Sequence, residues 1–164
     1  MTPISKAAQK TFDALVADLP VGEERVIGKP GGAIQPLHVE RLTEHTYSLA
    51  HYYEQNGDLV PDPDGEFWRG DDGRVYPVSL RQCTGLYTEA MVLMPPPKCE
   101  VVGPPDVQLQ VTAHCLAQID PRKQRELASF AAMWLRNIRW QQEDYFTQPP
   151  STDVLQAEPE RGQA

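Results

Sequence analysis

Short runs of strand-forming residues, separated by turn residues, fill the middle of the chain and constrain its fold more than any other feature. Asn56-Gly57 and Asp71-Asp72-Gly73 are turn sequences, because these residues tolerate the backbone angles that tight turns require. Pro77 makes its strand an edge strand or an irregular one, since proline has no N–H to donate within a sheet. Runs at intervals of roughly 8–12 residues are typical of an antiparallel meander. We therefore expect four or five short strands, at about 37–42, 46–54, 67–68, 74–80 and 86–93.

A helix is expected on each side of this region. Thr2 can cap the first helix and Pro3 suits its first position, and apolar residues then recur at helical spacing through about residue 17. Asp120 can cap a longer helix over 121–145. The longer helix has one wide apolar face, formed by Leu127, Phe130, Ala131, Trp134, Leu135 and Ile138. The pattern predicts an α+β domain, with an N-terminal and a long C-terminal helix packed on one face of the sheet.

The domain organisation follows from length and local composition. A chain of 164 residues buries roughly 70% of its unfolded surface, so it needs no disulfide or metal to hold a core. We expect a single domain over 1–146. Residues 147–164 contain three prolines and few bulky apolar side chains, so we expect a disordered tail. Residues 106–117 fit either a strand or a helix.

Composition argues against several classes of protein. The net charge of -8 disfavours a protein that coats nucleic acid, because phosphate binding needs a cationic surface. The apolar stretches are far shorter than the roughly 20 residues of a membrane helix. Three cysteines without a C-x-x-C pair disfavour a disulfide framework and a zinc site. Charged residues occupy the N-terminal region where a signal peptide is apolar, so we expect a cytoplasmic protein. We also expect that the protein binds no membrane and needs no cofactor.

The charge is unevenly distributed. Residues 54–72 contain seven acidic side chains against one arginine, whereas residues 121–140 contain five basic side chains against one glutamate. A helical wheel places four arginines and a tryptophan opposite the apolar face of the second helix. This arginine stripe comprises Arg122, Arg125, Arg136, Arg139 and Trp140. We consider two interpretations: a contact surface for an acidic protein or a nucleic-acid strand, or a solvated helix face that the chain's own acidic segment neutralises.

The acidic segment invites a metal hypothesis, which its spacing does not support. Asp62 and Asp64 resemble the start of a calcium-binding EF-hand loop, but Gly65 comes too early in the loop and no helix precedes it. A metal-dependent hydrolase remains an alternative, built from His51, Asp58, Asp62 and Asp64. A nucleophile pair of Cys83 with His51 is a further one. Either alternative requires its side chains to converge on one pocket.

The string LAHYYEQNGDL at residues 49–59, followed by Asp62-Pro63-Asp64 and by Gly85-Leu86-Tyr87, resembles a family of small uncharacterised proteins. That family is a domain of unknown function found on bacterial plasmids, integrative elements and phages. The resemblance covers about residues 37–93, and this chain departs from it at Gly65, where the family tends to have an apolar residue, and at Cys83, where it tends to have an acid. The residues that carry the motif are His51, Tyr52, Tyr53, Gln55, Asn56, Gly57, Asp58, Asp62 and Asp64.

This resemblance implies a mobile-element accessory protein and supplies no catalytic residue. Together with the arginine stripe, it predicts a non-catalytic protein that binds a partner, which we expect to be a protein rather than a nucleic acid. One version is an anti-defence inhibitor, whose acidic surface imitates the phosphate charge of nucleic acid and occupies a host immune complex. The hydrolase described above is the other alternative.

Overall fold

The computed structural model of the protein describes residues 1–29, 34–94 and 115–147. The helices are α1 (Lys6–Val16), α2 (Pro121–Gln141) and α3 (Glu143–Thr147). The strands are β1 (Glu24–Ile27), β2 (Leu37–Arg41), β3 (Thr46–Gln55), β4 (Asp58–Arg69), β5 (Val75–Arg81), β6 (Tyr87–Glu89), β7 (Met91–Met94) and β8 (Cys115–Ile119).

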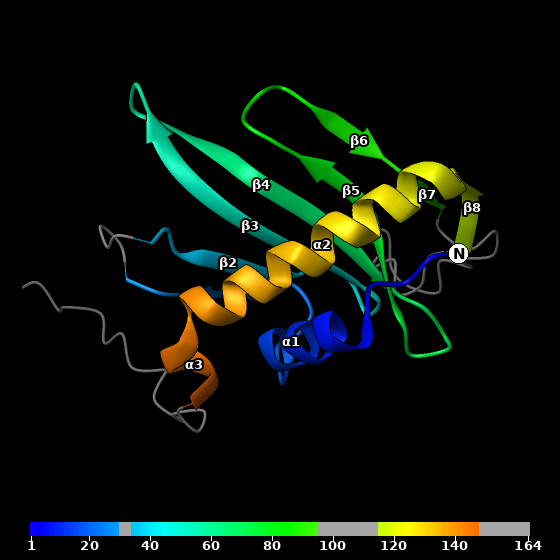
Figure 1. Ribbon diagram of the computed structural model, residues 1–164, viewed down its shortest axis with the longest axis horizontal. Helices are drawn as coiled ribbons and strands as arrows, with labels where there is room; N and C mark the ends of the chain where they lie inside the picture. Colours follow the sequence, from blue (N-terminus) through cyan, green and yellow to red (C-terminus); the bar gives the residue numbers. More distant parts are fainter. Residues whose placement is uncertain (30–33, 95–114, 148–164) are drawn as a thin grey trace, which may run out of the picture.

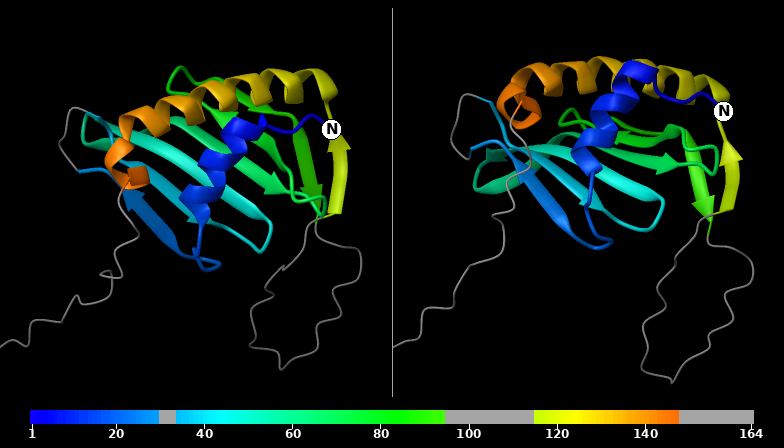
Figure 2. Two further views of the ribbon diagram at one scale, coloured as in Figure 1. Left: turned by 60° about the horizontal axis from the view of Figure 1, so that its bottom comes forward. Right: turned by 90° about the horizontal axis from the view of Figure 1, so that it is seen from below.

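Strands β1 to β6 form one antiparallel sheet in the order of the chain, and β7 and β8 form a separate pair. Helices α1 and α2 lie together on one face of the large sheet, and the β7–β8 pair stands at one end of it (Figures 1 and 2). This arrangement confirms the α+β class with an N-terminal helix and a long C-terminal helix. The sheet has six strands rather than four or five, chiefly because β1 lies before the region in which strands are predicted.

The hairpin of β3 and β4 corrects the prediction that the strand after Asn56-Gly57 covers only residues 67–68. Asn56 and Gly57 form its two-residue turn with φ angles of 55° and 88°, as their sequence predicts. Beyond that turn, β4 is a strand of 12 residues and not a loop followed by a short strand. Counting from the two-residue turn, Gln55–Asp58 and Tyr53–Val60 are the hydrogen-bonded pairs. Pro61 belongs to the next pair, opposite Tyr52, where the N–H of a residue points away from β3. A proline there costs the hairpin no hydrogen bond, so a residue that signals a turn sits inside a strand.

The same hairpin extends beyond its neighbours. Strand β2 pairs with β3 only as far as His51, and β5 pairs with β4 only from Asp64. Residues 52–63 therefore project from the sheet as a two-stranded ribbon (Figure 1). Most of the motif residues of the family resemblance lie on this ribbon.

Tertiary contacts shift the start of the first helix. The structure caps α1 with Ser5, whose Oγ accepts a hydrogen bond from the N–H of Ala8 at 3.2 Å, and not with Thr2. The N–H of Thr2 instead donates to Gln124 Oε1 at 2.6 Å, and the N–H of Ile4 donates to the carbonyl of Val75 at 2.9 Å. These bonds to α2 and β5 keep residues 2–4 out of the helix, although local sequence favours a helix there.

The main core lies between the two long helices and the sheet. Asp120 caps α2 as predicted, and Leu127, Trp134, Leu135 and Ile138 are buried on its sheet-facing side. From α1, the buried set includes Ala8, Phe12, Leu15 and Val16. The helix expected over 121–145 is divided at Gln142, whose N–H donates to the carbonyl of Ile138 before α3 begins. No described helix is long and apolar enough to cross a membrane.

The predicted strand at 86–93 is divided at Ala90, where the chain leaves the large sheet. The N–H of Ala90 donates to the carbonyl of Val78, and its own carbonyl accepts from the N–H of Asp120, both at 2.8 Å. Strand β5 is irregular at Pro77, as predicted, but it is not an edge strand, because β6 pairs with its second half. Of residues 106–117, which fit either a strand or a helix, 115–117 belong to strand β8 and the others lie outside the described residues. Residues 148–164 of the expected tail also lie outside the described residues.

Candidate functional site

The structure does not bring the four hydrolase candidates together. His51 lies on the helix-covered face, with its ring 5.9 Å from that of Trp134 and its Nδ1 3.1 Å from the carbonyl of Pro36. Burial lowers the pKa of His51 below its ordinary value. Asp64 lies on the opposite face, where it accepts a hydrogen bond from Ser48 Oγ at 3.3 Å.

The other two carboxylates diverge as well. Asp58 is exposed beside the turn of the ribbon, and Asp62 accepts a hydrogen bond from the N–H of Cys83 at 3.3 Å. Cys83 is exposed next to Asp62, and its hydrogen bond to that carboxylate raises the pKa of the thiol. Within the described residues, no group of three or more His, Cys, Asp or Glu side chains could hold a metal ion.

The arginine stripe is an exposed surface along the outer side of α2. All four of its arginines are exposed, and Trp140 is 77% exposed. Among the described residues, its ion pairs are limited to Arg122 Nε with Glu126 Oε1 at 3.2 Å, and none reaches the acidic segment. The segment at 54–72 lies largely on β3 and β4, which α2 covers with its opposite side. The described residues therefore do not neutralise the stripe in the way that the second interpretation requires.

A groove of about 420 Å³ runs beside the stripe, between α1 and α2. Its floor consists largely of small side chains, and its rim carries Arg136 and Arg139. Met133 also lines the groove and is 46% exposed. The groove thus offers an apolar recess next to two cations, a combination that suits an acidic partner with one apolar side chain.

The face of the sheet opposite the helices is acidic, and this surface is not evident from the sequence. Consecutive cross-strand partners form one row across all six strands. The row consists of Glu24, Glu40, Ser48, Glu66, Ser79 and Glu89. Asp64 occupies the neighbouring row, between Ala50 and Arg81. We call these side chains the acidic face.

The negative charge of the acidic face contributes to the raised pKa values of two tyrosines. Burial raises the pKa of Tyr52, and the carboxylates of Asp64, Glu24 and Glu40 raise it further. Burial likewise raises the pKa of Tyr87, to which the carboxylate of Glu89 contributes. Ionising a phenol adds negative charge, so nearby carboxylates disfavour it.

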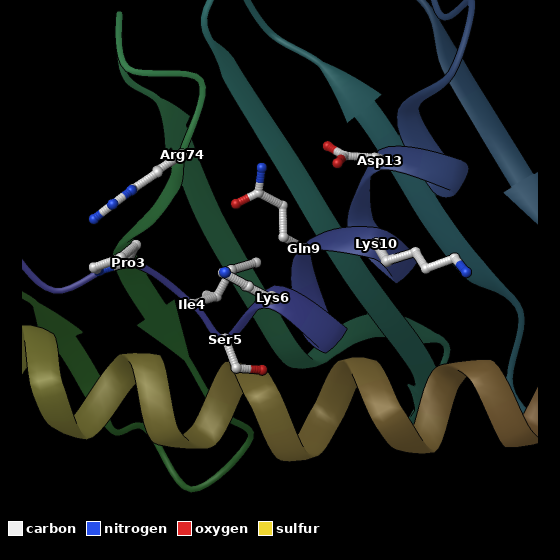
Figure 3. A pocket seen from close by; sticks show the side chains of 8 residues that line it. All are labelled: Pro3, Ile4, Ser5, Lys6, Gln9, Lys10, Asp13 and Arg74. Carbon is white, nitrogen blue, oxygen red and sulfur yellow. The ribbon is translucent and has the colours of Figure 1, made fainter.

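A second hollow, of about 650 Å³, lies between the outer side of α1 and the turn after β4. Its lining includes Lys6, Lys10 and Arg74, but Figure 3 shows Lys10 and Arg74 extending in different directions rather than toward one point. Arg74 pairs with Asp72 at 3.8 Å, and Gln9 Nε2 donates to the carbonyl of Gly73 at 3.0 Å. This hollow therefore lacks a convergent set of groups.

Comparison with known proteins gives one match. A family described as a domain of unknown function (DUF6908) matches residues 12–102. No curated protein and no solved structure matches the chain. The matched span includes α1 from Phe12 onward, the large sheet with its ribbon, and the acidic face, whereas the arginine stripe lies beyond it. The chain therefore belongs to the DUF6908 family, a domain of unknown function.

Proposed function

We propose that the chain is a non-catalytic accessory protein of a mobile element, acting in the cytoplasm by docking an acidic partner protein on the arginine stripe. The observation that carries this proposal is the exposure of four arginines and Trp140 on one side of α2, away from the chain's own acidic segment. Arginine and tryptophan are the side chains that most often dominate the binding energy of protein interfaces.

Charge and shape favour a protein over a nucleic acid as this partner. A nucleic acid on the stripe would meet a molecule whose net charge is -8. A DNA duplex carries one negative charge per about 1.7 Å of its axis, far more than an acidic protein does, so long-range repulsion opposes a nucleic acid more strongly than a protein. The recess beside Met133 accepts an apolar side chain, which a phosphate backbone does not offer.

Affinity capture from host-cell lysate with charge-reversed variants tests the proposal. The stripe variant carries Arg136→Glu and Arg139→Glu, and the matched control carries Lys6→Glu and Lys10→Glu, an equal charge change on exposed side chains of α1. We expect the wild type and the control to retain the same discrete acidic protein, and the stripe variant to lose it. Added salt should weaken the capture, because exposed charges are screened within roughly 8–10 Å.

Several results would contradict the proposal. Capture that disappears after nuclease treatment identifies a nucleic-acid partner. Equal capture by the wild type and the stripe variant places the binding surface elsewhere. The stripe variant must also melt near the wild-type temperature, because the guanidinium of Arg139 lies 5.4 Å from the ring centre of Phe146 and a loss of folding would imitate a loss of binding.

The acidic face supports a second candidate function, an anti-defence inhibitor that imitates nucleic acid. The observation in its favour is the row of carboxylates across the sheet, since regularly placed negative charges resemble a phosphate backbone to a basic binding groove. A host nuclease complex assayed with the wild type and with a variant carrying Glu40→Lys and Glu89→Lys tests it. Inhibition by the wild type alone supports imitation; equal inhibition by both proteins, or none, contradicts it.

A further inference from the structure

We propose that the acidic partner of the arginine stripe is a second copy of this chain, whose acidic face receives the stripe. The inference rests on the proposed function and names the partner of the same surface. In the proposed contact, the outer side of α2 of one copy lies across the acidic face of the next copy.

The two surfaces lie on opposite sides of the molecule. Helix α2 covers one face of the sheet (Figure 2), and its arginines are exposed on the side away from its buried residues. The row from Glu24 to Glu89 lies on the other face, because Glu40 and Ser48 alternate along their strands with the buried Val39 and Leu49. The acidic face of one copy therefore cannot contact the arginine stripe of the same copy. Each copy offers one stripe and one acidic face, so the contact is head-to-tail and continues into a ring or a filament.

The two surfaces also match in length. At 1.5 Å per residue, Arg122 and Arg139 are separated by about 25 Å along α2. The row crosses five spacings between neighbouring strands, which is about 24 Å from Glu24 to Glu89. A helix laid across the strands thus places both of its charged ends over the sheet.

Both surfaces carry charged side chains at each of their two ends. The stripe carries one pair of arginines near each end, with Ser129 and Met133 between them. The acidic face carries Glu24 and Glu40 at one end and Glu89 at the other, and Glu66 lies near its centre between Ser48 and Ser79. The small side chains of Ser48 and Ser79 let a helix approach the sheet on both sides of Glu66.

The experiment measures the mass of the full chain in solution by analytical ultracentrifugation, from micromolar to near-millimolar concentration and at several salt concentrations. We expect the weight-average mass of the wild type to rise above 18.4 kDa with concentration and to fall with added salt. Both the stripe variant (Arg136→Glu, Arg139→Glu) and the face variant (Glu40→Lys, Glu89→Lys) should remain monomeric. The variant that combines all four changes exchanges the charges between the surfaces and should associate again, whereas Lys6→Glu with Lys10→Glu should behave as the wild type.

Each contrary result overturns the inference. A wild type that stays monomeric at every concentration excludes self-association. Association that survives either reversal shows that another surface mediates it, and failure of the four-fold variant to associate, while it remains folded, shows that the two surfaces do not meet. If the wild type is monomeric and the stripe variant still loses a captured acidic protein, the inference is wrong and the proposed function stands. If neither association nor stripe-dependent capture occurs, both fail.

Discussion

His51 illustrates how the parity of a strand decides the role of a polar side chain. It shares the strand parity of Tyr47 and Leu49 and so lies on the same face of β3, which predicts a packed and hydrogen-bonded imidazole rather than a metal ligand. In the structure it is 9% exposed, beside Trp134, and its Nδ1 lies within hydrogen-bond distance of the carbonyl of Pro36. A buried imidazole is more stable neutral than charged, which is why its pKa is lowered.

This burial makes stability depend on pH. Below the ordinary pKa of about 6.5 the unfolded chain takes up a proton at His51 that the folded chain resists, so acidification favours unfolding until the lowered folded pKa is reached. We expect His51→Gln, which retains a donor for Pro36, to remove this contribution. The difference in unfolding free energy between wild type and variant should be constant above about pH 7.5 and shift against the wild type below pH 6.5.

Urea denaturation across this pH range measures the effect, whose slope is at most about 1.4 kcal/mol per pH unit. Stability curves that run parallel for the two proteins below pH 6.5 would show that His51 titrates alike in the folded and unfolded chain.

At the scale of elements, the seating of α2 on β4 depends on Gly65. A Cβ atom at this position would lie 3.1 Å from Cζ3 of Trp134 and 3.3 Å from Cε2 of Phe67, too close for either ring to remain in place. The indole of Trp134 thus occupies the space that a side chain at position 65 would need. Trp134 is 5% exposed, and its Nε1 has no hydrogen-bond partner among the described residues.

A double-mutant cycle measures this contact. We expect Gly65→Ala to destabilise the protein by about 1–3 kcal/mol through overpacking. In a Trp134→Phe background the same change should cost less, because the phenyl ring lacks Cζ3 and leaves room for the methyl group. Trp134→Phe should itself cost less than Trp134→Ala, for which about 3–5 kcal/mol is expected, since it keeps an aromatic ring and removes a buried unpaired donor. Equal costs of Gly65→Ala in both backgrounds would show that Trp134 is not the obstacle.

The elements that the sequence predicts correctly are those set by local rules. Asp120 and the helical spacing after it define α2, and Asn56-Gly57 defines the hairpin turn, without reference to the rest of the chain. Strand β4 was predicted wrongly because Pro61 and Gly65 signal turns locally, and only the pairing with β3 shows that neither breaks the strand. The acidic face depends on the register of six strands, so no single segment of sequence reveals it. The arginine stripe, in contrast, could be located from the sequence because one helix carries all of it.

At the scale of the whole molecule, the sheet holds like charges close together. Glu24 and Glu40 are direct cross-strand partners on β1 and β2, an arrangement that destabilises a sheet. We expect Glu40→Lys to stabilise the folded chain by about 0.2–1 kcal/mol at low salt, because it places opposite charges across the pair. The gain should shrink as salt is added, and Glu40→Gln should give an intermediate value.

Thermal unfolding at low and high salt measures this gain. A Glu40→Lys variant no more stable than the wild type at low salt would contradict the idea that the acidic face carries repulsion. Ultracentrifugation of the Glu40→Lys single variant then tests whether the substitution that strengthens the fold also weakens self-association, as expected where charges are kept for recognition at the expense of stability.

The separation of the arginine stripe from the acidic face gives the molecule a direction. A body with positive charge on one side and negative charge on the other experiences a torque in an electric field, and it turns before it makes contact. Near an acidic surface the protein turns its α2 side toward that surface, and near a basic surface it turns the acidic face toward it. How this protein meets a charged partner is therefore decided by its orientation at close range, and its net charge of -8 describes only the approach from far away.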